Sequence, residues 1–120
     1  MWTHGRPVAG LATISGQCWG SYENQHQYTR RAGFGVDAAG DLIYVAGAKL
    51  TLPTLALALV DAGVLQAMEL DIHSASVSFA SWTPSVPGHV VPTKLLPGME
   101  RPAGWYLSAD QRDFFYLTLG

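Results

Sequence analysis

The chain has 120 residues, 48% of them apolar and 13% charged, and its formal net charge at pH 7 is −2. This length predicts a single domain over residues 1–120, and the apolar content excludes a disordered chain, because burying that surface offsets the entropy lost on folding. The seven Lys and Arg residues form no basic patch, and no apolar run is long enough to cross a membrane. We therefore expect neither a nucleic-acid partner nor a membrane-spanning segment.

Cysteine and histidine usage argues against a metal site. The single cysteine, Cys18, excludes an internal disulfide and a zinc site built from several cysteines. His4, His26 and His89 lie in expected loops and lack the spacing of metal ligands. The first seven residues lack the hydrophobic region of a signal peptide. The sequence thus names no metal ligands, does not decide whether a metal takes part, identifies no cofactor and carries no export signal of its own.

The first clear element is a hairpin. Residues 1–27 are rich in glycine and polar groups, and we expect only a short strand there, around residues 8–14. Two strand-like arms, 28–37 and 41–47, then flank Ala38-Ala39-Gly40, which places a glycine where a hairpin loop needs a positive φ.

The next segment predicts the main helix, at about residues 52–62. Thr51 can cap its start, and Gly63 can end it in the left-handed conformation that glycine favours. Its apolar residues fall on one face, as expected for a helix packed on a core: Leu52, Leu55, Ala56 and Leu59. A short loop then leads into a strand that ends at Ile72.

The C-terminal third is predicted to be less regular. Val77 to Trp82 alternates apolar and small polar residues, as a half-buried strand does. Five prolines over residues 83–104 predict a long loop, and residues 113–119 read as a closing strand. Together these elements predict an α+β fold, in which a mostly antiparallel, twisted sheet packs on one main helix.

The strongest candidate site is the end of the strand before Ile72. Strict alternation would put Glu69, Asp71 and His73 on one face. Two carboxylates and an imidazole held together can share a proton or bind a cation, and their charges push their pKa values apart as acid–base catalysis requires. The alternative is a solvated strand end with ordinary surface charges.

Further candidates lie close to these residues in the sequence or in the preceding hairpin. Ser74 follows His73 and is a possible nucleophile, although no Gly-x-Ser-x-Gly elbow surrounds it. Arg31 precedes Gly33 and Gly35, and a guanidinium beside glycines can hold a phosphate or a carboxylate in bidentate fashion. The alternative for Arg31 is a solvent-facing side chain beside a bulge.

From about residue 5 to the end, the chain resembles the C-terminal half of the phosphodiester glycosidase domain family, and most nearly a bacterial secreted branch of it. In the N-terminal part the likeness rests on a strand, a helix start and a strand end: Arg31-Ala32-Gly33-Phe34-Gly35, Thr51-Leu52-Pro53-Thr54-Leu55-Ala56 and Met68-Glu69-Leu70-Asp71-Ile72. Three later motifs recur in the same order: Lys94-Leu95-Leu96-Pro97, Arg101-Pro102 and Arg112-Asp113-Phe114.

The resemblance implies a hydrolase that acts on a glycosyl-1-phosphodiester and is secreted or associated with the cell envelope. It implies Asp71 as the leading catalytic or metal-positioning carboxylate, with Glu69 or His73 assisting as acid or base. Arg31 would hold the phosphodiester oxygens, and Gly35 and Ser74 complete the expected substrate-binding residues.

The chain departs from the family where the pattern has Gly-Gly-Gly-Ser after the aspartate, because it has Ile72-His73-Ser74-Ala75 there. Side chains in place of glycines narrow an anion pocket, so we expect altered or lost chemistry. A half-domain would also leave apolar surface uncovered, which a homodimer would bury. The alternative function is therefore a carbohydrate- or envelope-binding or assembly module without catalysis, for which the four tryptophans would provide contact surface.

Overall fold

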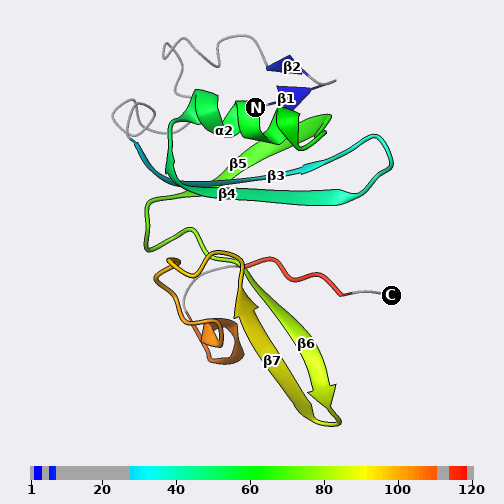
Figure 1. The fold of residues 1–120 in the computed structure, drawn as a ribbon, viewed down its shortest axis with the longest axis vertical. Helices are drawn as coiled ribbons and strands as arrows, with labels where there is room; N and C mark the ends of the chain where they lie inside the picture. Colours follow the sequence, from blue (N-terminus) through cyan, green and yellow to red (C-terminus); the bar gives the residue numbers. More distant parts are fainter. Residues whose placement is uncertain (1, 4–5, 8–27, 111–113, 119–120) are drawn as a thin grey trace. The chain divides into compact units, whose positions relative to one another are not determined.

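The computed structural model describes residues 2–3, 6–7, 28–110 and 114–118. The chain divides into two compact units, Met1–Val77 and Ser78–Gly120, each with its own sheet (Figure 1). The prediction of an α+β fold with antiparallel strands and one main helix is confirmed. The assignment of all 120 residues to a single domain stays a prediction.

The first unit contains a five-stranded antiparallel sheet with the strand order β2-β1-β5-β3-β4. Helix α2 lies along one side of β3 and β4 (Figure 1). The elements of this unit are β1 (Trp2–Thr3), β2 (Arg6–Pro7), β3 (Thr29–Val36), β4 (Leu42–Leu50), α2 (Leu52–Asp61) and β5 (Gln66–Ile72).

The predicted hairpin is confirmed as β3 and β4. The Asp37 carboxylate accepts hydrogen bonds from the backbone N–H groups of Ala39 and Asp41, at 2.8 and 2.9 Å, and these bonds close the loop. Gly40 has φ +90°, the conformation for which the sequence supplied a glycine. The hairpin therefore follows from local turn chemistry.

Both ends of the predicted helix are also confirmed. At the N-terminus the Thr51 and Thr54 side chains each accept a hydrogen bond from the other residue's backbone N–H, which forms a capping box. At the C-terminus Gly63 has φ +84° and donates to the Val60 carbonyl, while Val64 donates to the Leu59 carbonyl. These two hydrogen bonds form a Schellman motif, which ends the helix and directs the chain toward β5.

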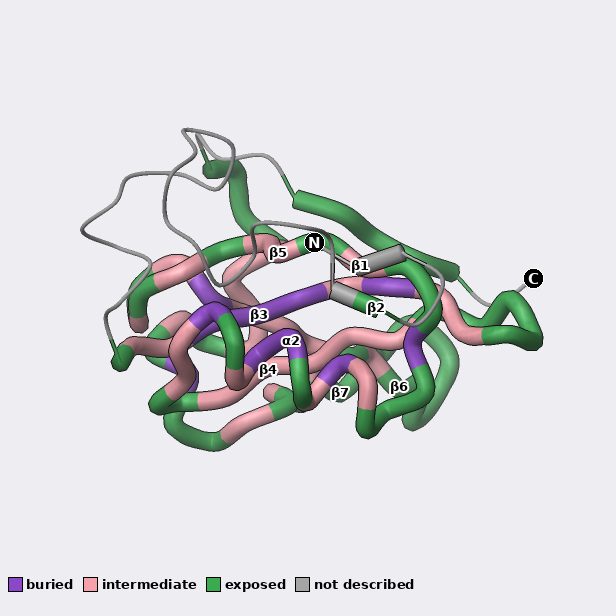
Figure 2. The backbone as a smooth tube through the Cα atoms, turned by 90° about the horizontal axis from the view of Figure 1, so that it is seen from above, coloured by how far each residue is buried: buried purple, intermediate pink, exposed green. Residues whose placement is uncertain are grey.

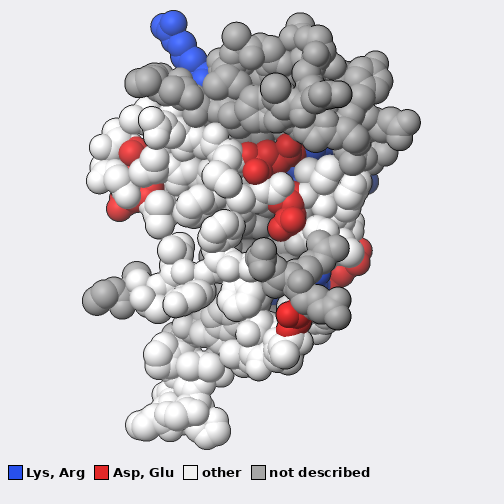
Figure 3. All heavy atoms as spheres, turned by 180° about the vertical axis from the view of Figure 1, so that it is seen from behind, with Lys and Arg blue, Asp and Glu red and all other residues white. Residues whose placement is uncertain are grey.

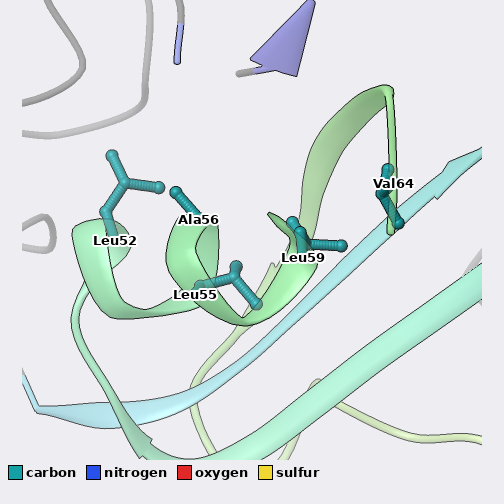
Figure 4. Close-up of a cluster of buried hydrophobic side chains, with 5 residues drawn as sticks. All are labelled: Leu52, Leu55, Ala56, Leu59 and Val64. Carbon is teal, nitrogen blue, oxygen red and sulfur yellow. The ribbon is translucent and has the colours of Figure 1, made fainter. Parts of the chain in front are cut away.

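The core of the first unit lies between α2 and the sheet (Figures 2 and 4). Leu55 and Leu59 point from the helix toward the strands, and the cluster comprises Leu52, Leu55, Ala56, Leu59 and Val64. The helix can approach because β3 presents glycines. A Cβ on Gly33 would lie 2.8 Å from Leu59, and one on Gly35 would overlap Val64 and the Gln66 carbonyl oxygen.

The second unit corrects the prediction of a loop over residues 83–104. It contains an antiparallel hairpin of β6 (Ala80–Val86) and β7 (His89–Lys94), followed by the short 3-10 helix η2 (Trp105–Leu107). Pro84 pairs with Val90, and Pro92 pairs with Trp82. These two pairs are two positions apart along the ladder, so both are hydrogen-bonded pairs or both are non-hydrogen-bonded pairs. In non-hydrogen-bonded pairs the N–H groups point away from the partner strand, and proline is tolerated there.

Three other predicted strands have different outcomes. The prediction of a closing strand over residues 113–119 is wrong for its described part, because residues 114–118 carry no regular secondary structure. Val77–Trp82 is half right, since β6 begins only at Ala80. The short strand expected around residues 8–14 lies outside the described residues.

Candidate functional site

The end of β5 holds a buried ion pair. The Arg31 guanidinium donates a 2.6 Å hydrogen bond from Nη1 to Glu69 Oε1, and its Nε donates to the Leu50 carbonyl oxygen at 3.0 Å. The Arg31 side chain is 0% exposed and that of Glu69 is 12% exposed. Glu69 on β5 faces Gly33 on β3, so both side-chain positions lie on the sheet face that carries α2.

Glu69 has an unusual protonation equilibrium. Burial raises the pKa of its carboxyl above the ordinary value of 4.5, and the hydrogen bond and charge of Arg31 offset only part of this rise. At a given pH, a larger fraction of Glu69 is therefore protonated and neutral than of a solvated glutamate. Such a carboxyl can serve as a proton donor nearer to neutral pH.

The expectation that Glu69, Asp71 and His73 share one strand face is wrong. Along β3, Gly33 faces Glu69 and Arg31 faces Ile72, so three steps on β5 match two on β3. The extra residue is a bulge, which interrupts the alternation between Glu69 and Ile72. Asp71 is exposed, whereas Glu69 points to Arg31. The bulge thus leaves two carboxyls, two residues apart, in contrasting surroundings.

His73 begins a tight turn directly after β5. Its φ is +74°, a left-handed value that is uncommon for a residue with a side chain. The backbone is held on both sides: the His73 N–H donates to the Arg30 carbonyl at 2.8 Å, and its own carbonyl accepts from Ser76 and Val77. The His73 side chain is exposed.

The remaining predicted site residues divide by location. Ser74 is partly exposed and follows His73 in the turn, so it lies at the strand end. Gly35 faces Ala67, well before the strand end, and the close packing of Val64 explains why a glycine stands there. The structure thus brings Arg31, Glu69, Asp71, His73 and Ser74 to one end of β5 and leaves Gly35 outside that group.

The role that the resemblance implies for Arg31 needs correction. A guanidinium with no exposed surface that donates to Glu69 and to Leu50 is not accessible to a phosphodiester in this conformation. Its position instead fixes the Glu69 carboxyl. Sequence spacing did not reveal this pairing, because the two residues are 38 positions apart.

The second unit contains two side-chain clusters that the sequence did not indicate. Asp110 accepts hydrogen bonds from Arg101 and from the Trp105 indole, and the Arg101 guanidinium lies 4.6 Å from the centre of the Trp105 ring. The other cluster is aromatic: Trp82 meets Tyr106 edge to face at 5.9 Å, and Tyr106 lies 5.4 Å from Phe114. Among the described residues the buried Trp82 indole nitrogen has no hydrogen-bond partner.

Other possible sites are few in the described part of the chain. An open hollow of about 560 Å³ lies at the β6–β7 turn, lined by residues 84–90. Across the described ranges no group of three or more His, Cys, Asp or Glu residues could hold a metal ion, while Cys18, His4 and His26 lie outside those ranges. None of the helices described is long and apolar enough to cross a membrane.

Comparison of the chain with protein-family models, with curated proteins and with solved structures finds no match.

Proposed function

We propose that the chain is a phosphodiester glycosidase-like hydrolase whose site is the end of β5. The observation that carries the proposal is the pair of unlike carboxyls, Glu69 and Asp71. Glu69 is mostly buried, is bound to Arg31 and has a raised pKa, whereas Asp71 is exposed to solvent. Glycoside hydrolysis generally uses two carboxyls whose surroundings hold one protonated and the other ionised.

The proposed substrate is a glycosyl-1-phosphodiester, on which the two carboxyls have different tasks. Glu69 in its protonated form donates its proton to the oxygen between the sugar and the phosphorus as the bond from the sugar carbon to this oxygen breaks, so that the phosphate leaves as a singly charged monoester. Asp71 in its ionised form takes a proton from the attacking water or stabilises the positive charge on the sugar. In this proposal Arg31 is a positioning residue that holds Glu69, and His73 and Ser74 contact the phosphate.

The backbone at His73 lends a second, independent support. The family pattern has glycine at this place, and glycine is the residue that adopts a positive φ without strain. This chain has a histidine there and still has φ +74°. A glycine-like backbone conformation at this position supports the proposed relation to the family's glycine-containing turn, although the histidine side chain is larger.

The test is hydrolysis of a small panel of glycosyl-1-phosphodiesters by the full chain, by Asp71→Asn and by Glu69→Gln. We expect each substitution to lower kcat at least about 100-fold, as loss of a positioned acid or base does. The matched control is Asp61→Asn, an exposed aspartate at the end of α2, which should retain full activity. Unchanged turnover in Asp71→Asn would contradict the assignment.

A second candidate is a carbohydrate-binding module without catalysis, favoured by the Trp82–Tyr106–Phe114 cluster. Aromatic faces stack on sugar rings, and Phe114 is exposed. In this case a glycosyl phosphate would bind without turnover, and Phe114→Ala would weaken binding while Asp71→Asn would not. The same panel, followed by calorimetry, separates the two functions.

A further inference from the structure

The turn of the β6–β7 hairpin exposes apolar side chains and carries almost no ionisable group. Val86 is 56% exposed, and Val90 and Val91 are each 50% exposed. Residues 72–93 contain no Asp, Glu, Lys or Arg, so His89 is the one ionisable side chain near the turn. The turn is accordingly white on the face shown in Figure 3. Moving such a surface from water into an apolar surrounding removes apolar area from water and desolvates no fixed charge.

The exposed valines lie on both faces of the hairpin. Val90 pairs with Pro84, and Val91 pairs with Thr83. Because side chains alternate along a strand, Val90 and Val91 point to opposite faces, and each of them is half exposed. A flat protein surface covers one face of a two-stranded hairpin and leaves the other face in water. A lipid phase surrounds an inserted turn and covers both faces.

The backbone of the turn also suits an apolar surrounding. An N–H group without a partner is costly in lipid, because no water is present to accept its hydrogen bond. Proline has no N–H group, and the hairpin has Pro84 in β6, Pro87 in the turn and Pro92 in β7. These three prolines therefore reduce the number of backbone donors that insertion would have to desolvate.

We propose that the β6–β7 turn, residues 84–91, inserts into the surface of a phospholipid bilayer. Trp82 lies four residues before Val86, which is roughly 13 Å along an extended strand. With the valines about 5–10 Å deep in the boundary between headgroups and acyl chains, Trp82 is at the level of the headgroups, where tryptophan is enriched. Strands of seven and six residues extend roughly 20 Å, less than the hydrocarbon core of about 30 Å, so the hairpin enters one leaflet only.

The attraction in this proposal is hydrophobic and not electrostatic. Lys94 and Arg101 are the Lys and Arg residues among the described part of this unit, and their side chains donate to the Met99 carbonyl and to Asp110. Polybasic segments bind anionic lipid, and salt weakens that binding. Binding through the β6–β7 turn needs no anionic lipid and does not weaken with salt.

The experiment is co-sedimentation of the full chain with vesicles of pure phosphatidylcholine, and with vesicles that also contain phosphatidylserine, at low and at high salt. We expect equal binding to both vesicles at both salt concentrations. In hydrogen–deuterium exchange the amides of residues 85–91 should gain protection when phosphatidylcholine vesicles are added, while those of β3 should not change. Val90→Asp and Val91→Asp place a charge on one face and on the other, and each should weaken binding at least about tenfold.

Two further variants separate lipid insertion from damage to the hairpin. Val90→Thr/Val91→Thr keeps the branched shape and the strand preference of valine but adds two hydroxyls, and it should weaken binding several-fold in a folded chain. The matched control is Leu57→Asp, an equally drastic change at a 61% exposed leucine on α2, which should bind as the natural chain does.

Four outcomes would overturn the proposal. The first is a chain that does not bind phosphatidylcholine vesicles, and the second is binding that requires phosphatidylserine or disappears at high salt. The third is weakening by only one of Val90→Asp and Val91→Asp, because a single contact face then indicates a protein-like surface. The fourth is a threonine double variant that binds as tightly as the natural chain.

Discussion

Glu69 is the residue whose energetics are most distinctive. Because burial raises the pKa of its carboxyl above 4.5, the folded state holds the proton more tightly than the unfolded state. The stability that this proton linkage provides is fully present below the ordinary pKa and is lost as the pH rises through the raised value.

We therefore expect the free energy of unfolding to fall more steeply with rising pH, from about 4.5 upward, in the natural chain than in Glu69→Gln. Gln can still accept from Arg31 but does not titrate. Urea titrations at a series of pH values measure this, with Glu100→Gln, an exposed glutamate, as the control. Parallel pH profiles for the natural chain and Glu69→Gln would contradict the expected linkage.

His73 gives a second prediction at this scale, since a left-handed conformation costs a residue with a side chain about 1 kcal/mol. Glycine removes that cost, although it also makes the unfolded chain more flexible. We expect His73→Gly to leave the melting temperature unchanged or higher. The control His89→Gly, on an exposed position of β7, should lower it, because glycine weakens a strand. An equal loss in both variants would show that the His73 turn is not strained.

The candidate site illustrates how far single residues could be interpreted from sequence. The sequence predicted a strand that ends just after Glu69 and Asp71, and β5 does end at Ile72, whereas the role of these residues in a site stays a prediction. It did not indicate that Arg31 would be buried against Glu69, because that contact depends on the register of two strands that are distant in the chain. The bulge that separates Glu69 from Asp71 also has no local signature.

At the level of elements, the start of α2 depends on a reciprocal pair of threonines. The Thr51 hydroxyl accepts the Thr54 N–H, and the Thr54 hydroxyl accepts the Thr51 N–H at 2.8 Å. Thr51→Ala removes one half of this box, and we expect it to cost about 1 kcal/mol of stability in chemical denaturation. Thr51→Ser keeps the acceptor oxygen and should restore most of the loss. If serine were as destabilising as alanine, the cap would contribute through packing instead.

Elements with strong local signals were the ones that the sequence predicted well. The β3–β4 loop and both ends of α2 depend on residues only a few positions apart, such as Gly40 and Gly63. The sequence did not predict the β6–β7 hairpin, because several prolines in one segment indicate a loop unless their positions in the strand pairing are known. Residues 114–118 have strand propensity but no strand partner in the described chain, and propensity alone does not make a strand.

For the whole molecule, buried side chains are distributed unequally between the two units. The buried apolar residues that the structure describes belong to Met1–Val77, except Met99. The second unit is instead held by its hairpin ladder, the Trp82–Tyr106 contact and the Lys94 ammonium, which donates to the Met99 carbonyl at 2.8 Å. A two-stranded hairpin with so small a core has little stability of its own.

Amides of β6 and β7 should therefore exchange with solvent through openings of lower free energy than those of β3 and β5, as native-state hydrogen exchange measures. Leu59→Ala, at a fully buried position under α2, should cost about 2–5 kcal/mol and lower the protection of β3 and β5. If the second unit opens independently, the protection of β6 and β7 will not change in this variant. A parallel loss in all four strands would instead mean that the two units unfold as one cooperative body, and the hairpin would owe its order to the rest of the chain.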